Sequence, residues 1–229
     1  MSPARKPVPL MSAEISSAGN LAFNGTADLT GPQGSGTLLF DPETLTIANS
    51  GPNDSELSDD VINAGDGSGD WTVSAAAVEA ALSTANVVLE AVKKVSVEAP
   101  VTSTSNKDLT LRAGEKVYIG APIDLGGSLN LYADLVEINE HIASGERVLV
   151  DSLRTVLANG ACIEAADDIR ILNNETVDLL GDIKAGDVLT IQASTEANLA
   201  GKLEGKIYSD NDGKAAQDTS SAPVVNVNS

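Results

Sequence analysis

The chain is poor in aromatic residues. Of its 229 residues only 3% are Phe, Trp or Tyr, whereas 42% are hydrophobic. A core must therefore be built from Val, Leu, Ile and Ala. Small aliphatic side chains in this quantity favour a narrow and repetitive interior over a globular core that is built around large rings.

Cysteine and histidine occur once each. A single cysteine excludes an internal disulfide. Because Cys162 stands between Ala161 and Ile163 in an apolar stretch, we predict that it is a small buried core residue. His141 has no matched acid or nucleophile beside it in the sequence, so we do not expect it to act in catalysis.

Basic residues are outnumbered, with 14 Lys and Arg against 33 Asp and Glu and a formal charge of -19. Such a surface repels phosphate backbones and anionic membranes, so nucleic acid is not an expected partner. There is no run of the ~18 apolar residues that a membrane span needs, and membrane insertion is not expected. The start, "MSPARKPVPLMSAEIS", also lacks the continuous apolar segment of a secretory signal.

A repeat of about 20 residues organises the chain. Three short apolar pieces recur in each unit, and each piece alternates apolar and polar residues as a half-buried strand does. The first piece begins at Val87, Leu109, Leu129, Val148, Ile169 and Leu189, with gaps of 22, 20, 19, 21 and 20 residues. The second begins at Val95, Val117, Val136, Thr155, Val177 and Ala197, and the third at Val101, Ile123, Ile142, Ile163, Ile183 and Leu203.

Corner residues separate the pieces, among them Gly120-Ala121-Pro122 and Asn159-Gly160. Gly and Asn tolerate the left-handed backbone conformations that sharp corners need. Three strands and three corners per unit predict a right-handed parallel β-helix of about eight coils, in which inward positions stack at a rise of about 4.8 Å per coil. The sequence does not contain the consensus of a leucine-rich repeat. A helical repeat is also excluded, because the apolar residues are spaced by two and not by three or four.

One insertion and two tails complete the predicted organisation. We expect a flexible segment over 1–14, the β-helix over 15–207 and a flexible tail over 208–229, in which "PVVNVN" is able to add as a final strand. The insertion, 49–86, begins with a polar acidic loop. The stretch "WTVSAAAVEAALSTANV" (71–87) then reads as a helix with Ser74 as its N-cap, Trp71 as an anchor, and Val78 and Leu82 on the buried face.

Upstream of the insertion the same alternation continues, and Leu21 and Phe23 stand 17 residues before Leu38 and Phe40, so two further coils are expected there.

The segment "GSGTLLFDPETLTI", followed by "WTVSAAAVEAALSTANVVLEAVKKVSVEAPV", resembles the filamentous haemagglutinin-like exoproteins of two-partner secretion. In that family a "GTLLIDP" segment precedes a short helix and an "N-V-x-L-x-A" coil. The likeness runs from about Leu21 to Leu203 and is most specific between Gly36 and Val101.

The resemblance implies a β-helix from a long, secreted, surface-associated fibre, often an adhesin, with no catalytic residues. We therefore expect a non-enzymatic structural or adhesive stalk, located outside the cell or on its surface. Its expected partners are a surface glycan or protein of a host or neighbouring cell. Because the chain shows neither a signal sequence nor the family's amino-terminal secretion domain, we also expect a fragment or a processed form.

A polysaccharide-acting enzyme or a carbohydrate-binding β-helix is the alternative. Such enzymes group carboxylates on the outer face of adjacent coils. The outward charges do not fall at one repeat position in neighbouring coils, so they are interpreted as solvated surface. They are Asp134, Asp151, Asp167, Asp168, Arg112, Arg147, Arg154 and Arg170.

A weak calcium hypothesis rests on "DGSGD", in which Asp66, Ser68 and Asp70 alternate on a glycine-rich loop. Oxygen ligands at this spacing resemble the opening of a calcium loop, but Ala77 stands where the bidentate Glu belongs. No other cofactor is expected.

The ends of the solenoid raise the possibility of self-association. A β-helix ends in unpaired strand edges, and no capping helix is expected at either end because the helix candidate is internal. Either the neighbouring parts of a longer stalk cap these edges, or copies of the chain stack end to end into homo-oligomers or filaments, with the tail adding a strand to the next subunit.

Overall fold

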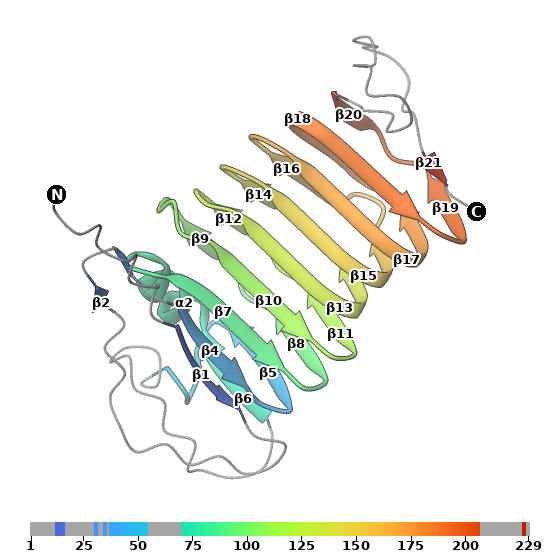
Figure 1. Ribbon diagram of the computed structural model, residues 1–229. Coiled ribbons are helices and arrows are strands. Elements are labelled where there is room, and N and C mark those ends of the chain that lie inside the picture. Colours follow the sequence, from blue (N-terminus) through green and yellow to red (C-terminus); the bar gives the residue numbers. More distant parts are fainter. Residues whose placement is uncertain are drawn as a thin grey trace, which may run out of the picture.

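A computed structural model of the chain describes residues 12–16, 30–31, 34–35, 37–54, 70–206 and 226–227. Over these residues the chain winds into a parallel β-solenoid of about 6 turns with one short helix (Figure 1). The predicted parallel β-helix is thus confirmed, with slightly fewer coils than the eight expected. No helix among the described residues is long and apolar enough to span a membrane.

Three parallel faces run along the solenoid, and the long strands turn from one face to the next. The first face contains β1 (Ser12–Ser16), β4 (Thr37–Asp41), β7 (Asn86–Ala91), β10 (Leu109–Ala113), the first parts of β13 (Leu129–Ile138), β15 (Val148–Leu157) and β17 (Ile169–Leu179), the end of β18 (Asp182–Ala193), and β21 (Asn226–Val227). The second contains β6 (Asp70–Ser74), β5 (Thr44–Ala48), β8 (Lys94–Val97), β11 (Lys116–Ile119), the later parts of β13, β15 and β17, and β19 (Glu196–Leu199).

The third face is the simplest. It contains β9 (Val101–Ser103), β12 (Ile123–Leu125), β14 (Ile142–Ser144), β16 (Cys162–Ala165), the start of β18, and β20 (Leu203–Lys206). Separately, β2 (Thr30–Gly31) and β3 (Gly34–Ser35) form a small antiparallel pair.

The strand register matches the predicted repeat at every position. Residues that begin the first apolar piece stand opposite one another from Val87 to Leu189. The second column runs in register from Val95 to Ala197. The third runs from Val101 to Leu203. Except for Ala197 and Leu203, which are partly buried, all of these residues are buried, so three ladders form one continuous core.

Short polar side chains fasten successive coils at one corner. The Asn86 Oδ1 atom accepts the backbone N–H of Asp108 at 3.1 Å, and Asp108 Oδ1 in turn accepts that of Ser128 at 2.9 Å. At the start of the coil that begins at Ile169, Asp168 Oδ1 accepts the N–H of Val188 at 3.2 Å. Part of the acidic content therefore satisfies backbone donors that a sharp corner would leave unpaired.

The predicted helix exists but is shorter than the stretch 71–87. Helix α2 (Ala75–Leu82) begins after Ser74, whose hydroxyl accepts the Ala77 N–H at 3.1 Å and thereby confirms the N-cap. Trp71 and Val73 instead belong to β6, where they stand opposite Leu45 and Ile47 of β5. Their alternating apolar pattern lets β6 extend the second face, and for this reason the helix starts later.

Helix α2 is internal, as expected, and it covers the first described strand of the third face. Val78 and Leu82 are buried, as predicted. The Glu79 carboxylate accepts the backbone N–H of Thr102 in β9 at 2.7 Å, and Ser105 Oγ donates to the Leu82 carbonyl at 2.5 Å. The helix thereby pairs a donor of β9 on the side where no described strand lies alongside it.

The described parts next to the insertion and the tails are also paired. Thr72 N–H donates to Asn53 Oδ1 at 3.0 Å, which holds the start of the polar loop against β6. Ahead of β4, the paired strand is β1, whereas Leu21 and Phe23 lie outside the described residues. Strand β21 pairs with Gln192 and Ala193 of β18, so part of "PVVNVN" does add a strand.

Candidate functional site

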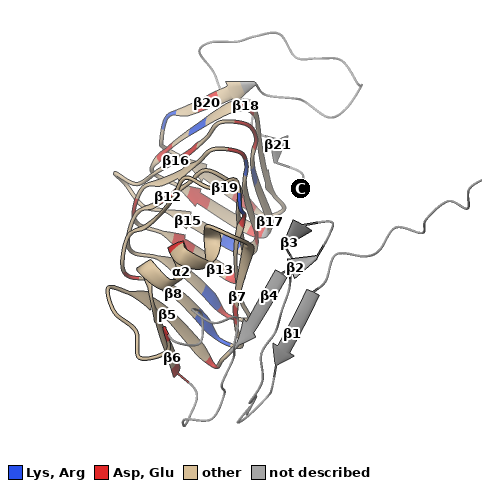
Figure 2. Ribbon diagram, turned by 90° about the vertical axis from the view of Figure 1, so that its left-hand side faces the viewer, with Lys and Arg blue, Asp and Glu red and all other residues tan. Residues whose placement is uncertain are grey.

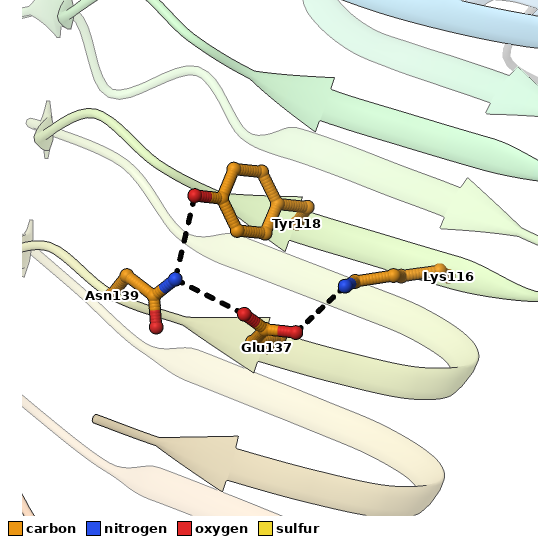
Figure 3. A network of polar contacts seen from close by, with 4 residues as sticks. All are labelled: Lys116, Tyr118, Glu137 and Asn139. Atoms are coloured by element: carbon orange, nitrogen blue, oxygen red, sulfur yellow. Dashed lines mark hydrogen bonds and ion pairs between the residues drawn. The ribbon is translucent and has the colours of Figure 1, made fainter.

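The most developed polar cluster on the outside lies on the second face, around Tyr118 of β11. The Nζ atoms of Lys94 and Lys116 stand 5.4 and 5.2 Å from the centroid of its ring. Both are within the range at which a cation is attracted to an aromatic ring. Figure 3 shows the ring beside Lys116, Glu137 and Asn139. We refer to Lys94, Lys116, Tyr118, Glu137 and Asn139 as the Tyr118 cluster.

Glu137 links the members of the Tyr118 cluster. Its carboxylate lies 2.6 Å from the Lys116 ammonium and accepts a hydrogen bond from Asn139 Nδ2 at 3.1 Å. The amide of Asn139 also lies 3.4 Å from the Tyr118 hydroxyl. The hydrogen bond from Lys116, together with that from Asn139 and the positive charges nearby, outweighs partial burial and lowers the pKa of Glu137.

Gly120 allows the Tyr118 ring to lie close to the backbone. A Cβ atom on Gly120 would lie 2.4 Å from Cε1 of that ring, a distance that atoms do not tolerate. The ring therefore covers this glycine at the end of β11. An aromatic surface with an ammonium, a carboxylate and an amide at its edge offers stacking and hydrogen bonds to a polar ligand that carries an apolar face.

A second cluster joins the only histidine to the only cysteine. His141 Nδ1 lies 2.5 Å from Cys162 Sγ, across one coil. The prediction of a buried Cys162 is wrong, because the thiol is only partly buried while Ala161 and Ile163 are inside. Period-two alternation that places Ile163 in the core necessarily turns its neighbour outward.

The environment of Cys162 does not activate the thiol. Burial, followed by the negative charges of Glu164 and Asp182, raises its pKa, so the thiol stays protonated at neutral pH. Asp182 stands opposite Cys162 on the next coil, but its Oδ1 atom accepts the Lys202 N–H at 2.8 Å. Within the part of the chain that the structure describes, no group of three His, Cys, Asp or Glu residues is arranged to hold a metal ion.

The calcium hypothesis is only partly open to inspection. Asp66 and Ser68 lie outside the described residues. Asp70 is the first residue of β6, and its Oδ1 atom accepts a hydrogen bond from Thr44 Oγ1 at 2.6 Å. That contact joins β5 to β6 and accounts for one of the three predicted ligands without a metal.

The outward charges are interspersed rather than grouped by sign (Figure 2). Arg112 pairs with Glu90 at 3.2 Å, and Arg170 pairs with Asp168 at 3.3 Å. Across the strand pairs described, no carboxylate residue stands opposite another on the adjacent coil. The registered strands therefore do not present the side-by-side acids that a glycosidase of this architecture would use.

Comparisons of the chain with family models, curated proteins and solved structures found no match.

The Tyr118 cluster and the His141–Cys162 contact were both missed by the sequence analysis. The signal for each is a separation of one coil, since 21 residues part His141 from Cys162 and 19 part Tyr118 from Glu137. Polar residues that stand one repeat apart at the same phase of alternation become neighbours in a β-helix. The inward ladders were aligned in this way, but the outward positions were not.

Proposed function

We propose that the chain is a non-enzymatic, structural or adhesive segment of a bacterial cell-surface or secreted fibre. The observation that carries the proposal is the parallel in-register stacking of the three apolar columns over successive coils, which continues past the two local register shifts near Ser152 and Lys184. A solenoid of this kind grows by about 4.8 Å per coil without changing its cross-section, so its length is set by the number of repeats. The resemblance to filamentous haemagglutinin-like exoproteins supports the same function.

The surface chemistry also favours a stalk over an enzyme. Acidic residues fasten corners or face basic residues, as Glu90 faces Arg112 and Glu164 faces Lys184. Burial and the negative charges nearby raise the pKa of the Cys162 thiol, which disfavours the thiolate that acts as a nucleophile.

Location and accessibility on the producing cell test this proposal. Antibodies raised against the purified chain should label intact cells or the culture medium, and protease added to intact cells should remove the label. An antibody to a cytoplasmic protein of the same cells is the control for leakage. Labelling that appears only after lysis would overturn the proposal.

Association end to end is part of the proposed function. Among the described strands, β19 pairs with β17 only, so its other backbone edge has no described strand partner, whereas the outer edge of β6 is bonded to Asn53 and Asp54. Electron microscopy over a range of protein concentrations should show rods whose length increases with concentration. Rods of one length at every concentration would contradict self-assembly while leaving the stalk function intact.

Carbohydrate binding is the second candidate, and the Tyr118 cluster favours it specifically. A sugar ring has an apolar face that stacks on an aromatic ring, while its hydroxyl groups bond to side chains at the edge. Tyr118 supplies the ring, and Glu137, Asn139 and the two lysines supply the polar groups.

An oligosaccharide array with neutral and acidic glycans tests the second candidate. Tyr118→Ala should abolish any glycan signal that the unaltered chain gives. Tyr132→Ala is the matched control, because Tyr132 is a second outward tyrosine whose ring lies beneath Arg112 at 5.0 Å. Glycan binding that survives Tyr118→Ala, or an array without signal, would exclude this site.

A further inference from the structure

The core contains one polar cluster, made of Ser152, Thr155 and Asn173. These residues are 4%, 0% and 2% exposed, respectively. In the coil before Ser152 the corresponding positions hold Ala133 and Val136. Ser152 and Thr155 thus stand where the preceding coil has apolar side chains, and Asn173 stands opposite Ser152 on the next coil.

The three side chains bond to one another. Asn173 Nδ2 donates to Ser152 Oγ at 2.8 Å and to Thr155 Oγ1 at 2.9 Å, and the two hydroxyl oxygens lie 2.9 Å apart. Both amide protons are used, and one hydroxyl donates to the other. The amide oxygen of Asn173, Oδ1, is buried and has no hydrogen-bond partner.

The missing partner does not result from the orientation of the amide. If the oxygen and nitrogen of Asn173 are exchanged, the oxygen accepts from both hydroxyls, but the NH₂ group then has no acceptor. In either assignment one polar atom of Asn173 remains unpaired in the core. Native cores rarely leave such an atom without protein or water as a partner.

The unpaired atom faces the following coil. Ser152 and Thr155 belong to the preceding coil, and Asn173 Nδ2 points toward their hydroxyl groups. The other atom of the amide, Oδ1, therefore points away from these two hydroxyls. On the following coil Ala193 comes next in register after the pair Leu172 and Gln192, and Ala197 stands opposite Val177. Ala193 is buried and Ala197 is packed against the core. Two methyl groups therefore lie where larger side chains stand one coil earlier.

We propose that a single water molecule is bound inside the β-helix at Asn173, between its coil and that of Ala193. The water donates one hydrogen bond to Asn173 Oδ1. A metal cation does not fit these groups, because all three side chains are neutral and none supplies a carboxylate. The site is independent of the proposed function.

Crystallography of the unaltered chain is the direct test. We expect a density peak at about 2.7 to 3.2 Å from the outer amide atom of Asn173. A well-ordered corner without such a peak would overturn the proposal. Crystals soaked in rubidium chloride provide a second arm, since an anomalous peak at this position would identify a cation and contradict the water.

Solution NMR provides a test that does not depend on crystals. The side-chain amide protons of Asn173 should show a nuclear Overhauser effect to a long-lived water. The variant Ser152→Ala/Thr155→Val/Asn173→Ala should not bind the water. Measurements of water relaxation should then lack the contribution of one long-lived bound water that the unaltered chain shows. Absence of the effect in the unaltered chain would count against the site, whether or not the triple variant folds.

Discussion

Two coils of the solenoid share one backbone plan and have opposite side-chain arrangements. The coil that begins at Leu109 is apolar inside, and its outer surface carries Lys116 and Tyr118 of the Tyr118 cluster. The coil that begins at Val148 holds Ser152 and Thr155 in its core, while Leu153 is exposed outside. Both pair in parallel with their neighbours, and the coil that begins at Val148 has a register shift against the next coil between Ser152 and Arg154.

The contrast shows which forces are interchangeable in this fold. Backbone pairing between coils is common to both, whereas the inner corner accepts either alkyl contacts or hydroxyl and amide hydrogen bonds. Buried polar groups are tolerated because they bond to one another, not because the core is loose. The predictions below test how far this exchange extends.

The largest effect is expected from a cavity in the apolar coil. Leu111→Ala removes a fully buried side chain, and we expect it to lower the free energy of unfolding by about 2–5 kcal/mol, measured by chemical denaturation. Leu153→Ala is the matched control. Leu153 is 36% exposed, so its loss should change the free energy by no more than about 0.5 kcal/mol. Equal effects of the two substitutions would contradict the assignment of inside and outside.

An intermediate effect is expected from breaking the polar cluster in part. The double variant Ser152→Ala/Thr155→Val leaves the Asn173 amide without protein acceptors, and should cost about 1–3 kcal/mol in unfolding free energy. Adding Asn173→Ala removes the amide that has lost its acceptors. The corner then has only apolar side chains, like Ala133 and Val136 in the preceding coil. We expect the triple variant to be more stable than the double. A triple variant that is less stable would show that the cluster stabilises the corner beyond its own pairing.

The smallest effect concerns the outer surface of the apolar coil. Lys116→Met removes the ammonium that lowers the pKa of Glu137. A lowered carboxyl pKa stabilises the fold above the ordinary value of about 4.3 and ceases to do so as the pH falls through the lowered pKa. Because both side chains are about 30% exposed, the difference should be under about 1 kcal/mol at pH 7.

The pH dependence separates this contribution from lost packing. The difference in unfolding free energy between Lys116→Met and the unaltered chain should shrink as Glu137 is protonated in acid. A difference that stays constant from neutral to acid pH would assign it to the lysine stem over Tyr118 instead of to the ion pair.

Most of the fold was predictable because inward positions obey two simple periods. Apolar alternation marks the strands, and a spacing of about 20 residues marks the coils, so Leu109 and Val117 were aligned with their correct neighbours. The failure at Cys162 has a clear cause. The stretch around it is apolar, and this composition was given more weight than the alternation that turns Cys162 outward.

The outer surface was harder to predict from the sequence. Corner lengths vary, and with them the number of residues in each coil, so outward neighbours can be matched only after the register is known. The contact between Tyr118 and Lys94 depends on such a match. The position of α2 over β9 depends on which face lacks an earlier strand, and local helix signals do not contain that information.

The side-chain acceptors at the corner all bond in one direction along the solenoid, from one coil to the next. Asn86, Asp108 and Asp168 each present an oxygen that only a later coil occupies with its N–H group. A duplicate of the coil that begins at Leu109 would bring along both the acceptor for its successor and the donor for its predecessor, since Asp108 has both roles. Lengthening by repeat duplication requires no new corner chemistry, so a gene for this architecture is able to extend its product one coil at a time.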